Sequence, residues 1–309
     1  MKENEKNDQK MYYRMLGGTG LQVSVLSFGF WATYGVKEGM TNEEGIVKAK
    51  ECMQIARENG INLFDNAETY GNPSGAAEEI MGLAMEQLVK EDPDNWRRTD
   101  ILVSTKIFWG GVGVNEKGLS RKHINEGLDA SLKRLKVDYV DLLFCHRPDP
   151  ETPIEETVYA MNDLITQGKI LYWGTSEWSA SEIDYAFKVA DKFNLRGPTM
   201  EQPQYNLLYR DRFEKEYAPI FEKYKIGSTI WSPLASGVLS GKYMNRMPNK
   251  HRFKIKGYEW LKDELLQEEF LPKLNLIKKV ADELNVTMAQ ISIAWCLKNK
   301  NVSSVILGA

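Results

Sequence analysis

The chain alternates eight short apolar runs with longer segments in which apolar residues recur at helical spacing. This alternation predicts right-handed crossovers and a parallel sheet. Because the runs are almost continuously apolar, they favour a closed (β/α)8 TIM barrel over an open doubly wound sheet. An open dinucleotide-binding sheet would also carry G-x-G-x-x-G after its first strand, and that motif is absent there. The predicted barrel strands are residues 23–30, 61–65, 101–108, 137–145, 170–176, 198–202, 227–232 and 303–309.

The segments around these runs predict one hairpin and several helices. Residues 11–26 read as a β-hairpin about the Gly-Gly-Thr-Gly turn at 17–20. Between the third and fourth runs, Ser120 is the expected N-cap of a helix. One face of that helix would carry Ile124, Leu128, Ser131, Leu132 and Leu135. Similar spacing predicts helices over residues 154–165, 181–193 and 213–224.

We expect a single barrel domain over residues 12–309, preceded by a disordered polar tail at residues 1–11. Residues 235–270 form a long, basic and aromatic connection, and a connection of that length predicts a cover over a ligand. The alternative interpretation of residues 235–270 is a charged surface exposed to solvent. The sequence stops at Ala309, directly after the eighth run. We therefore expect a barrel that lacks its final helix and is incomplete at its C-terminal end.

Composition excludes several classes of function. With 40 basic and 43 acidic residues, the net charge of −3 gives no support for nucleic acid or an anionic membrane as partner. The three cysteines are too scattered for a disulfide framework or a metal site. The N-terminus lacks the apolar core of an export signal, and no apolar run is long enough to insert into a membrane. We expect a cytoplasmic protein without a metal.

Four polar residues lie at or near the ends of consecutive predicted strands: Asp65, Tyr70, Lys106 and His146. In a barrel, such positions meet at the C-terminal face, where active sites lie. Asp65 and Lys106 would pair there, and the ammonium would lower the pKa of the Tyr70 phenol, which could then protonate a developing alkoxide. His146 would orient the carbonyl. Taken singly, the four also fit a helix cap, a solvated lysine, a surface tyrosine and a loop histidine.

A set of motifs across residues 13–309 resembles the aldo-keto reductases. The set comprises DNAETYG, STKIFWGG, GLSRKHI, SLKRLKVDYVDLLFCHRPDP, YWGTSEWS, EQPQYN, WSPLASGVLSGKY and SSVILGA. Within the family, the chain looks most like the branch that contains the β subunits of voltage-gated potassium channels and their plant and microbial relatives. The resemblance implies NADPH-dependent reduction of aldehydes and ketones. It makes Tyr70 the general acid, Lys106 and Asp65 its tuning pair, and His146 the residue that orients the substrate.

The resemblance also implies a set of NADPH/NADP+ contacts. Ser176 and Gln202 would hold the nicotinamide carboxamide, and Lys242 and Arg252 would meet the phosphates, which suits NADPH over NADH. Trp31 would wall the substrate site. The nicotinamide side and the pyrophosphate would be lined by Trp231, Ser232, Pro233 and Leu234, followed by Ser236. For Trp231 the alternative is a plain core position.

Three departures from the channel-subunit pattern bear on function. Those subunits carry asparagine at the position of His146, so the histidine favours a working reductase. Glu177 replaces an arginine and Phe30 a smaller polar residue, and both changes are expected to alter the site. In the family, the chain continues after the eighth run into a helix start that helps to bind the adenosine and its 2′-phosphate. This sequence ends before that segment, so we expect either a truncated sequence or a cofactor site that lacks one wall.

Three functions remain open at this stage. The leading one is a reductase of small carbonyl compounds. The alternatives are an NADP(H)-sensing auxiliary subunit of a potassium channel, as a homotetramer or bound to a channel's cytoplasmic domain, and a barrel that cannot bind NADPH.

Overall fold

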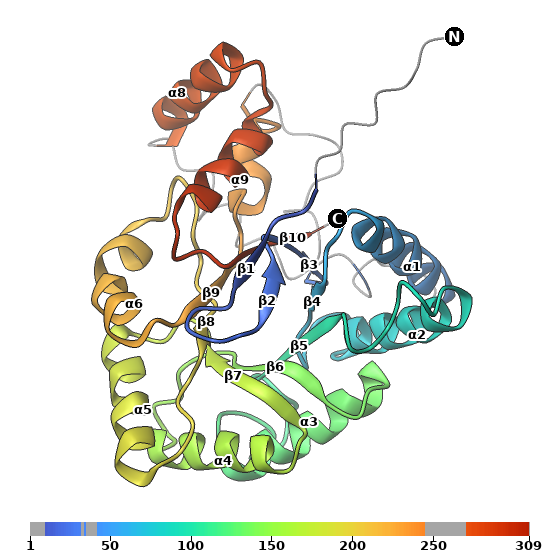
Figure 1. The fold of residues 1–309 in the computed structure, drawn as a ribbon, viewed down its shortest axis with the longest axis vertical. Helices are drawn as coiled ribbons and strands as arrows, with labels where there is room; N and C mark the ends of the chain where they lie inside the picture. The colour runs from blue at the N-terminus through green and yellow to red at the C-terminus, as the bar shows by residue number, and fades with distance from the viewer. Residues whose placement is uncertain (1–9, 32–33, 35–41, 245–269, 309) are drawn as a thin grey trace.

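The computed structural model describes residues 10–31, 34, 42–244 and 270–308, and its centre is a closed barrel of eight parallel strands. Around the barrel the strand order is β10-β3-β4-β5-β6-β7-β8-β9 (Figure 1). The fold predicted from the alternation is therefore confirmed. The strands are β3 (Leu26–Gly29), β4 (Leu63–Asp65), β5 (Leu102–Ile107), β6 (Val140–Cys145), β7 (Ile170–Thr175), β8 (Met200–Glu201), β9 (Gly227–Ile230) and β10 (Ser304–Gly308).

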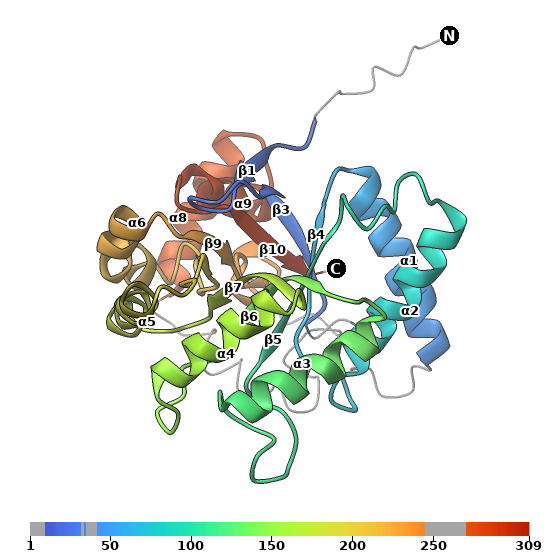
Figure 2. The same ribbon diagram turned by 60° about the horizontal axis from the view of Figure 1, so that its bottom comes forward.

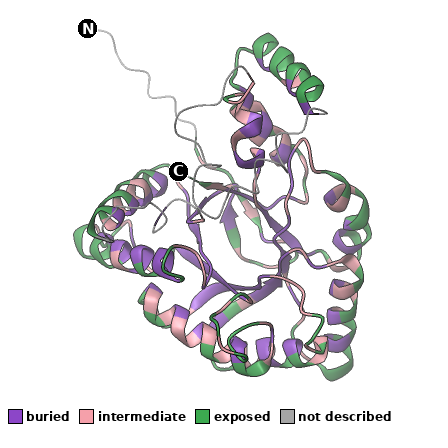
Figure 3. Cartoon of the chain, turned by 180° about the vertical axis from the view of Figure 1, so that it is seen from behind, coloured by how far each residue is buried: buried purple, intermediate pink, exposed green. Residues whose placement is uncertain are grey.

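Helices surround this barrel, and their exposed residues lie mostly on the side that faces away from the strands (Figures 2 and 3). The predicted helix after Ser120 is present, and the Ser120 hydroxyl accepts a hydrogen bond from the His123 backbone N–H at 3.2 Å. The α-helices are α1 (Asn42–Glu58), α2 (Ala76–Glu91), α3 (Arg121–Leu135), α4 (Ile154–Thr166), α5 (Ala180–Phe193), α6 (Ala218–Tyr224), α8 (Phe270–Glu283) and α9 (Met288–Lys298).

The helix predicted over residues 213–224 divides in two. A π-helical turn, η1 (Arg212–Glu216), is followed by α6. Pro219 stands in the first turn of α6 and has no backbone N–H, so the carbonyl four residues earlier loses its helical donor. One continuous α-helix is therefore interrupted at Tyr217.

The predicted N-terminal hairpin closes the bottom of the barrel. It consists of β1 (Tyr13–Met15) and β2 (Gln22–Ser24), and its Leu16 and Val23 pack onto inward-facing strand residues. Arg14 ties the hairpin to the other end of the chain, because its guanidinium donates to the carbonyls of Leu297 at 2.7 Å and Val302 at 2.6 Å. With this end filled by side chains, a ligand enters from the opposite, carboxyl end. The packed strand residues are Leu63, Leu102, Leu142, Phe144 and Met200.

The connection after β9 begins with a 3₁₀ segment, η2 (Ala235–Ser240), which packs with α8 and α9 in a small separate core. The greater part of the predicted cover, residues 245–269, lies outside the described residues. Among the described helices, none is both long and apolar enough to span a bilayer.

Candidate active site

The predicted Asp65–Lys106 pair is present and buried. Asp65 ends β4, Lys106 lies on the neighbouring strand β5, and the Lys106 Nζ lies 2.6 Å from the Asp65 Oδ2. Lys106 also donates to the carbonyl of Asn66 at 2.7 Å, and the Ser104 hydroxyl donates to the Asp65 Oδ1 at 2.8 Å. The Lys106 side chain is 0% exposed. Such a charge persists in a barrel core only because these oxygens replace its water.

Tyr70 and His146 lie beside this pair. Tyr70 lies in the turn between β4 and α2, and the Lys106 Nζ is 4.8 Å from the centre of its ring. His146 directly follows β6, and its ring meets the Tyr70 ring edge-on at 5.7 Å between centres. The four residues chosen from the sequence therefore gather at one point of the barrel mouth.

The charges of this group follow from burial and from each other. Burial lowers the pKa of His146 well below its ordinary value, and the Lys106 and Arg147 cations lower it further, so the imidazole is neutral near pH 7. Burial disfavours the charge on Lys106, but Asp65 and Tyr70 together raise its pKa above the ordinary value. Lys106 therefore remains an ammonium.

The pKa of Tyr70 departs from the sequence prediction. Burial is the largest influence and raises it, Lys106 lowers it as expected, and Asp65 raises it again. The prediction of a lowered pKa is wrong for the protein without ligands, because desolvation of the phenol outweighs the ammonium beside it. The phenol holds its proton at neutral pH.

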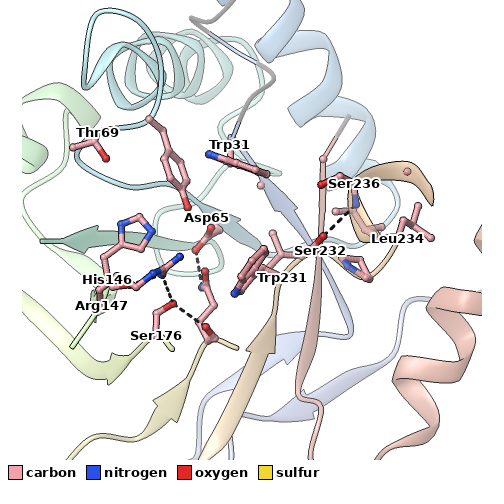
Figure 4. Close-up of a pocket in the computed structure, with 18 of the residues that line it drawn as sticks. Trp31, Asp65, Thr69, His146, Arg147, Ser176, Trp231, Ser232, Leu234 and Ser236 are labelled. Atoms are coloured by element: carbon pink, nitrogen blue, oxygen red, sulfur yellow. Dashed lines mark hydrogen bonds between the residues drawn. The ribbon is translucent and has the colours of Figure 1, made fainter. Parts of the chain in front are cut away.

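A cavity of about 570 Å³ opens above the four residues. Figure 4 shows His146, Arg147 and Ser176 at one end, Ser232, Leu234 and Ser236 at the other, and Trp31 and Trp231 between them. All the predicted site residues line it except Lys106, which lies beneath Tyr70, and Arg252, which lies outside the described residues. The predicted members of the lining are Trp31, Asp65, Tyr70, His146, Ser176, Gln202, Trp231, Ser232, Pro233, Leu234, Ser236 and Lys242.

Ser176 and Gln202 form one wall through contacts with each other and with Asp65. The Ser176 hydroxyl donates to the Gln202 carbonyl at 2.8 Å. The Gln202 amide nitrogen donates to the Asp65 Oδ1 at 3.1 Å and to the Thr229 hydroxyl at 3.2 Å. Ser176 and Gln202 thus lie directly against the Asp65–Lys106 pair.

The opposite end of the cavity has an unusual backbone. Ser232, Ala235 and Ser236 have φ values of 54°, 46° and 51°, a region that non-glycine residues rarely occupy, and Gly237 has 98°. Such strain in consecutive residues gathers at ligand-binding segments. A Cβ at Gly237 would lie 2.5 Å from the Lys242 Cε, so only glycine lets that lysine lie across the segment.

Two departures noted in the sequence lie behind the cavity wall. Phe30 is fully buried against Phe28 and Tyr34 and does not line the cavity. The Glu177 carboxylate accepts hydrogen bonds from the Trp231 indole N–H at 2.9 Å and the Gln204 backbone N–H at 2.6 Å. Glu177 therefore supports the wall from outside, and Phe30 has no contact with the cavity.

Sequence reasoning missed several lining residues. Arg147 and Trp109 each lie within one of the family motifs, but the resemblance gave them no role. Arg147 directly follows His146, and that adjacency was the available signal. The other lining residues that were missed belong to the ends of strands, to the turn after β4 and to η2: Gly29 of β3, Ile306, Leu307 and Gly308 of β10, Thr69, and Gly237.

A closed parallel barrel with a buried Asp–Lys pair, a phenol and a neutral imidazole at its carboxyl end has groups that suit proton transfer at a carbonyl. The model of the aldo/keto reductase family matches residues 25–309, and the chain belongs to that family. Its general chemistry is thus that of an oxidoreductase. The described residues contain no group of three or more His, Cys, Asp or Glu side chains placed to hold a metal ion.

Two plant proteins are similar over nearly the whole chain. A probable voltage-gated potassium channel subunit beta of Arabidopsis thaliana is 54% identical over 300 residues, which are 97% of this chain and 87% of that protein. A protein of the same description from Oryza sativa subsp. japonica is 53% identical over the same shares. The resemblance to the channel-subunit branch of the family is therefore confirmed.

Proposed function

We propose that the protein reduces the carbonyl group of small aldehydes and ketones in the cytoplasm with NADPH as the reductant. The observation that carries the proposal is the meeting of Asp65, Lys106, Tyr70 and His146 at one end of the cavity. A protonated phenol beside a neutral imidazole can hold a carbonyl oxygen and give it a proton.

Each of the four residues has a separate task. Tyr70 donates its proton to the oxygen as negative charge develops there, and the Lys106 ammonium stabilises the phenolate that remains. Asp65 holds Lys106 in place at 2.6 Å and keeps it charged. His146, neutral and packed edge-on against Tyr70, positions the carbonyl oxygen toward the phenol.

The cavity residues also fit the cofactor. The His146 Nδ1 is buried without a hydrogen-bond partner in the described structure, and the Ser232–Gly237 segment has the strained backbone that is typical of ligand-binding segments, with Lys242 lying close against Gly237. Ser176 and Gln202 would hold the carboxamide, and Ser236, Lys242 and Arg252 the phosphates. When bound, NADPH supplies the hydride.

Replacement of the general acid tests the proposal. Tyr70→Phe should lower the kcat for reduction of 4-nitrobenzaldehyde by a factor on the order of 10²–10⁴, because the proton donor is lost. NADPH binding, followed by fluorescence titration, should change little. Tyr159→Phe, a change on the exposed side of α4, is the matched control. Unchanged turnover in Tyr70→Phe rules out the mechanism.

A second candidate function rests on the descriptions of the two plant relatives, which are named as channel subunits. In this case the protein would bind NADP(H) and join the cytoplasmic domain of a potassium channel, assembled as a tetramer. Co-purification with such a domain, together with negligible turnover of aldehydes, would favour the subunit. A soluble oligomer with rapid turnover and no such association favours the reductase.

A further inference from the structure

Arg147 places a positive charge at the end of the cavity that holds the proton-donating residues. It follows His146 in sequence, is half-buried, and lines the cavity. Its Nη1 donates to the His146 carbonyl at 2.5 Å and to the Ser176 hydroxyl at 3.3 Å. These contacts fix the position of the guanidinium without neutralising it.

The charge of Arg147 has no counterion within the described ranges of the chain: no Asp or Glu oxygen there lies within the 4.0 Å of an ion pair. The acidic residue of the same cavity, Asp65, is already paired with Lys106 at 2.6 Å. A partly desolvated guanidinium with open donors favours an anion. Its protein contacts use Nη1, so Nε and Nη2 remain for a ligand.

The position of Arg147 separates it from the cavity's other anion-binding candidates. Figure 4 shows it beside His146 and Ser176, whereas the strained stretch that includes Ser232 and Ser236 lies at the far end. Its charge acts directly on the reacting groups, because it lowers the pKa of both Tyr70 and His146. An anion held by Arg147 would therefore lie next to the carbonyl under reduction.

Aromatic side chains make up part of the cavity lining. Trp31, Trp109 and the Tyr70 ring line the cavity together with Arg147. Flat apolar surfaces with a single fork-shaped cation suit a ligand with an apolar body and one carboxylate.

We propose that Arg147 binds a carboxylate of the substrate, so that the preferred substrates are carbonyl compounds that carry a carboxylate group. The inference rests on the proposed reductase function and adds the class of substrate. Reduction itself is unchanged: hydride adds to the carbonyl carbon, and the Tyr70 proton goes to the oxygen. The carboxylate takes no part in bond making.

The test uses two pairs of substrates that differ in charge and little in shape: 3- and 4-carboxybenzaldehyde against 3- and 4-nitrobenzaldehyde. The isomers place the anionic group at two distances from the carbonyl. In wild-type protein, kcat/KM should be higher for at least one acid than for its nitro analogue. Arg147→Met should lower that ratio by roughly tenfold to a hundredfold, through KM, because a charge-assisted hydrogen bond is lost.

Two further variants serve as controls. Arg147→Lys should keep part of the preference. Arg121→Met, which removes an exposed arginine on α3, should leave the ratio unchanged. An unchanged ratio in Arg147→Met overturns the proposal. If NADPH binding is weaker in the same variant, the cation serves the cofactor and not a substrate carboxylate.

The two proposals can fail separately. Turnover of the nitrobenzaldehydes tests the reductase alone. If there is no turnover, titration with benzoate followed by tryptophan fluorescence still decides the role of Arg147. Binding that Arg147→Met abolishes supports a carboxylate site, and equal binding by both proteins overturns it.

Discussion

The residue whose environment is most extreme is Lys106, an ammonium without solvent exposure. It survives there because Asp65 and the Asn66 carbonyl lie 2.6 Å and 2.7 Å from its Nζ. The two residues depend on each other, because removal of either partner leaves the other as an unpaired buried charge. It also lets the site keep a permanent cation beneath Tyr70, independent of solvent.

Replacement of Lys106 should therefore cost stability as well as activity. Lys106→Met should lower the free energy of unfolding by about 3–5 kcal/mol, because Asp65 would remain as an unpaired buried carboxylate. Urea unfolding followed by circular dichroism measures the change. The double variant Asp65→Asn with Lys106→Met should recover part of the loss. Equal stability of Lys106→Met and wild type would show that the pair is not coupled in the folded state.

The four residues at the barrel mouth, Asp65, Tyr70, Lys106 and His146, could be chosen from the sequence because each lies at or near the end of an apolar run. The topology of a parallel barrel brings such positions together whatever the details of the loops. The pKa of Tyr70 could not be predicted in this way, because it depends on how much water the phenol loses. Arg147 was missed for a related reason: nothing in a linear pattern tells which residue of a loop turns inward.

At the scale of elements, the ends of β7, β8 and β9 are joined by one carboxylate. Glu177, just after β7, accepts from the Gln204 backbone N–H beyond β8 and from the Trp231 indole beyond β9. Its second oxygen pairs with Arg212 of η1 at 2.6 Å. Glu177 has a positive φ of 59°, a strained conformation that these contacts maintain. The π-helical turn that precedes Pro219 thus carries a residue that holds the cavity wall.

Loss of this carboxylate should loosen Trp231. Glu177→Ala leaves the Trp231 indole N–H without its acceptor and removes one of the two carboxylates that pair with Arg212, and should destabilise the protein by about 1–3 kcal/mol. It should also shift the tryptophan emission to longer wavelength as the indole gains water. In a Trp231→Phe background the same change should cost less, because one of the orphaned donors is absent. If the losses in free energy of unfolding from Glu177→Ala and Trp231→Phe are strictly additive, the contact between Glu177 and Trp231 does not contribute to stability.

Two features of the helices and strands could not be predicted from the sequence: the π-helical turn and the contacts of Glu177. Apolar spacing over residues 213–224 predicts helix correctly, but the period cannot reveal that Pro219 interrupts it. The replacement of arginine by Glu177 was recognised as important from the family pattern. Its direction, outward to Arg212 and not into the cavity, depends on tertiary contacts that no local pattern encodes.

For the whole molecule, the buried acid Glu201 couples stability to pH. Burial raises its pKa to about 8, the Thr175 hydroxyl opposes the rise, and the nearby Glu177 charge adds to it. The folded protein therefore holds a proton there up to about pH 8, whereas the unfolded chain releases it near the ordinary value of 4.5. The contribution of this group to stability is complete below the ordinary value and is lost as the pH rises toward 8.

Substitution of the acid by its neutral analogue isolates this effect. Glu201→Gln should remove the decline in stability between about pH 5 and about pH 8. The free energy of unfolding of the variant should therefore rise relative to that of wild type over this range, and the difference between the two should be constant above it. Urea unfolding at a series of pH values gives both curves. Parallel curves for the two proteins would show that Glu201 does not titrate in this window.

The pairing of β3 with β10 has a consequence for synthesis on the ribosome. Residues 26–29 pair with residues 305–308, and the Arg14 guanidinium donates to the carbonyls of Leu297 and Val302. Until those late residues emerge, the nascent chain holds an open sheet with unpaired edges at β3 and β9, the kind of surface that invites aggregation. The barrel therefore closes only after β10 has emerged, and we expect chaperones to have their greatest effect on this protein before that moment.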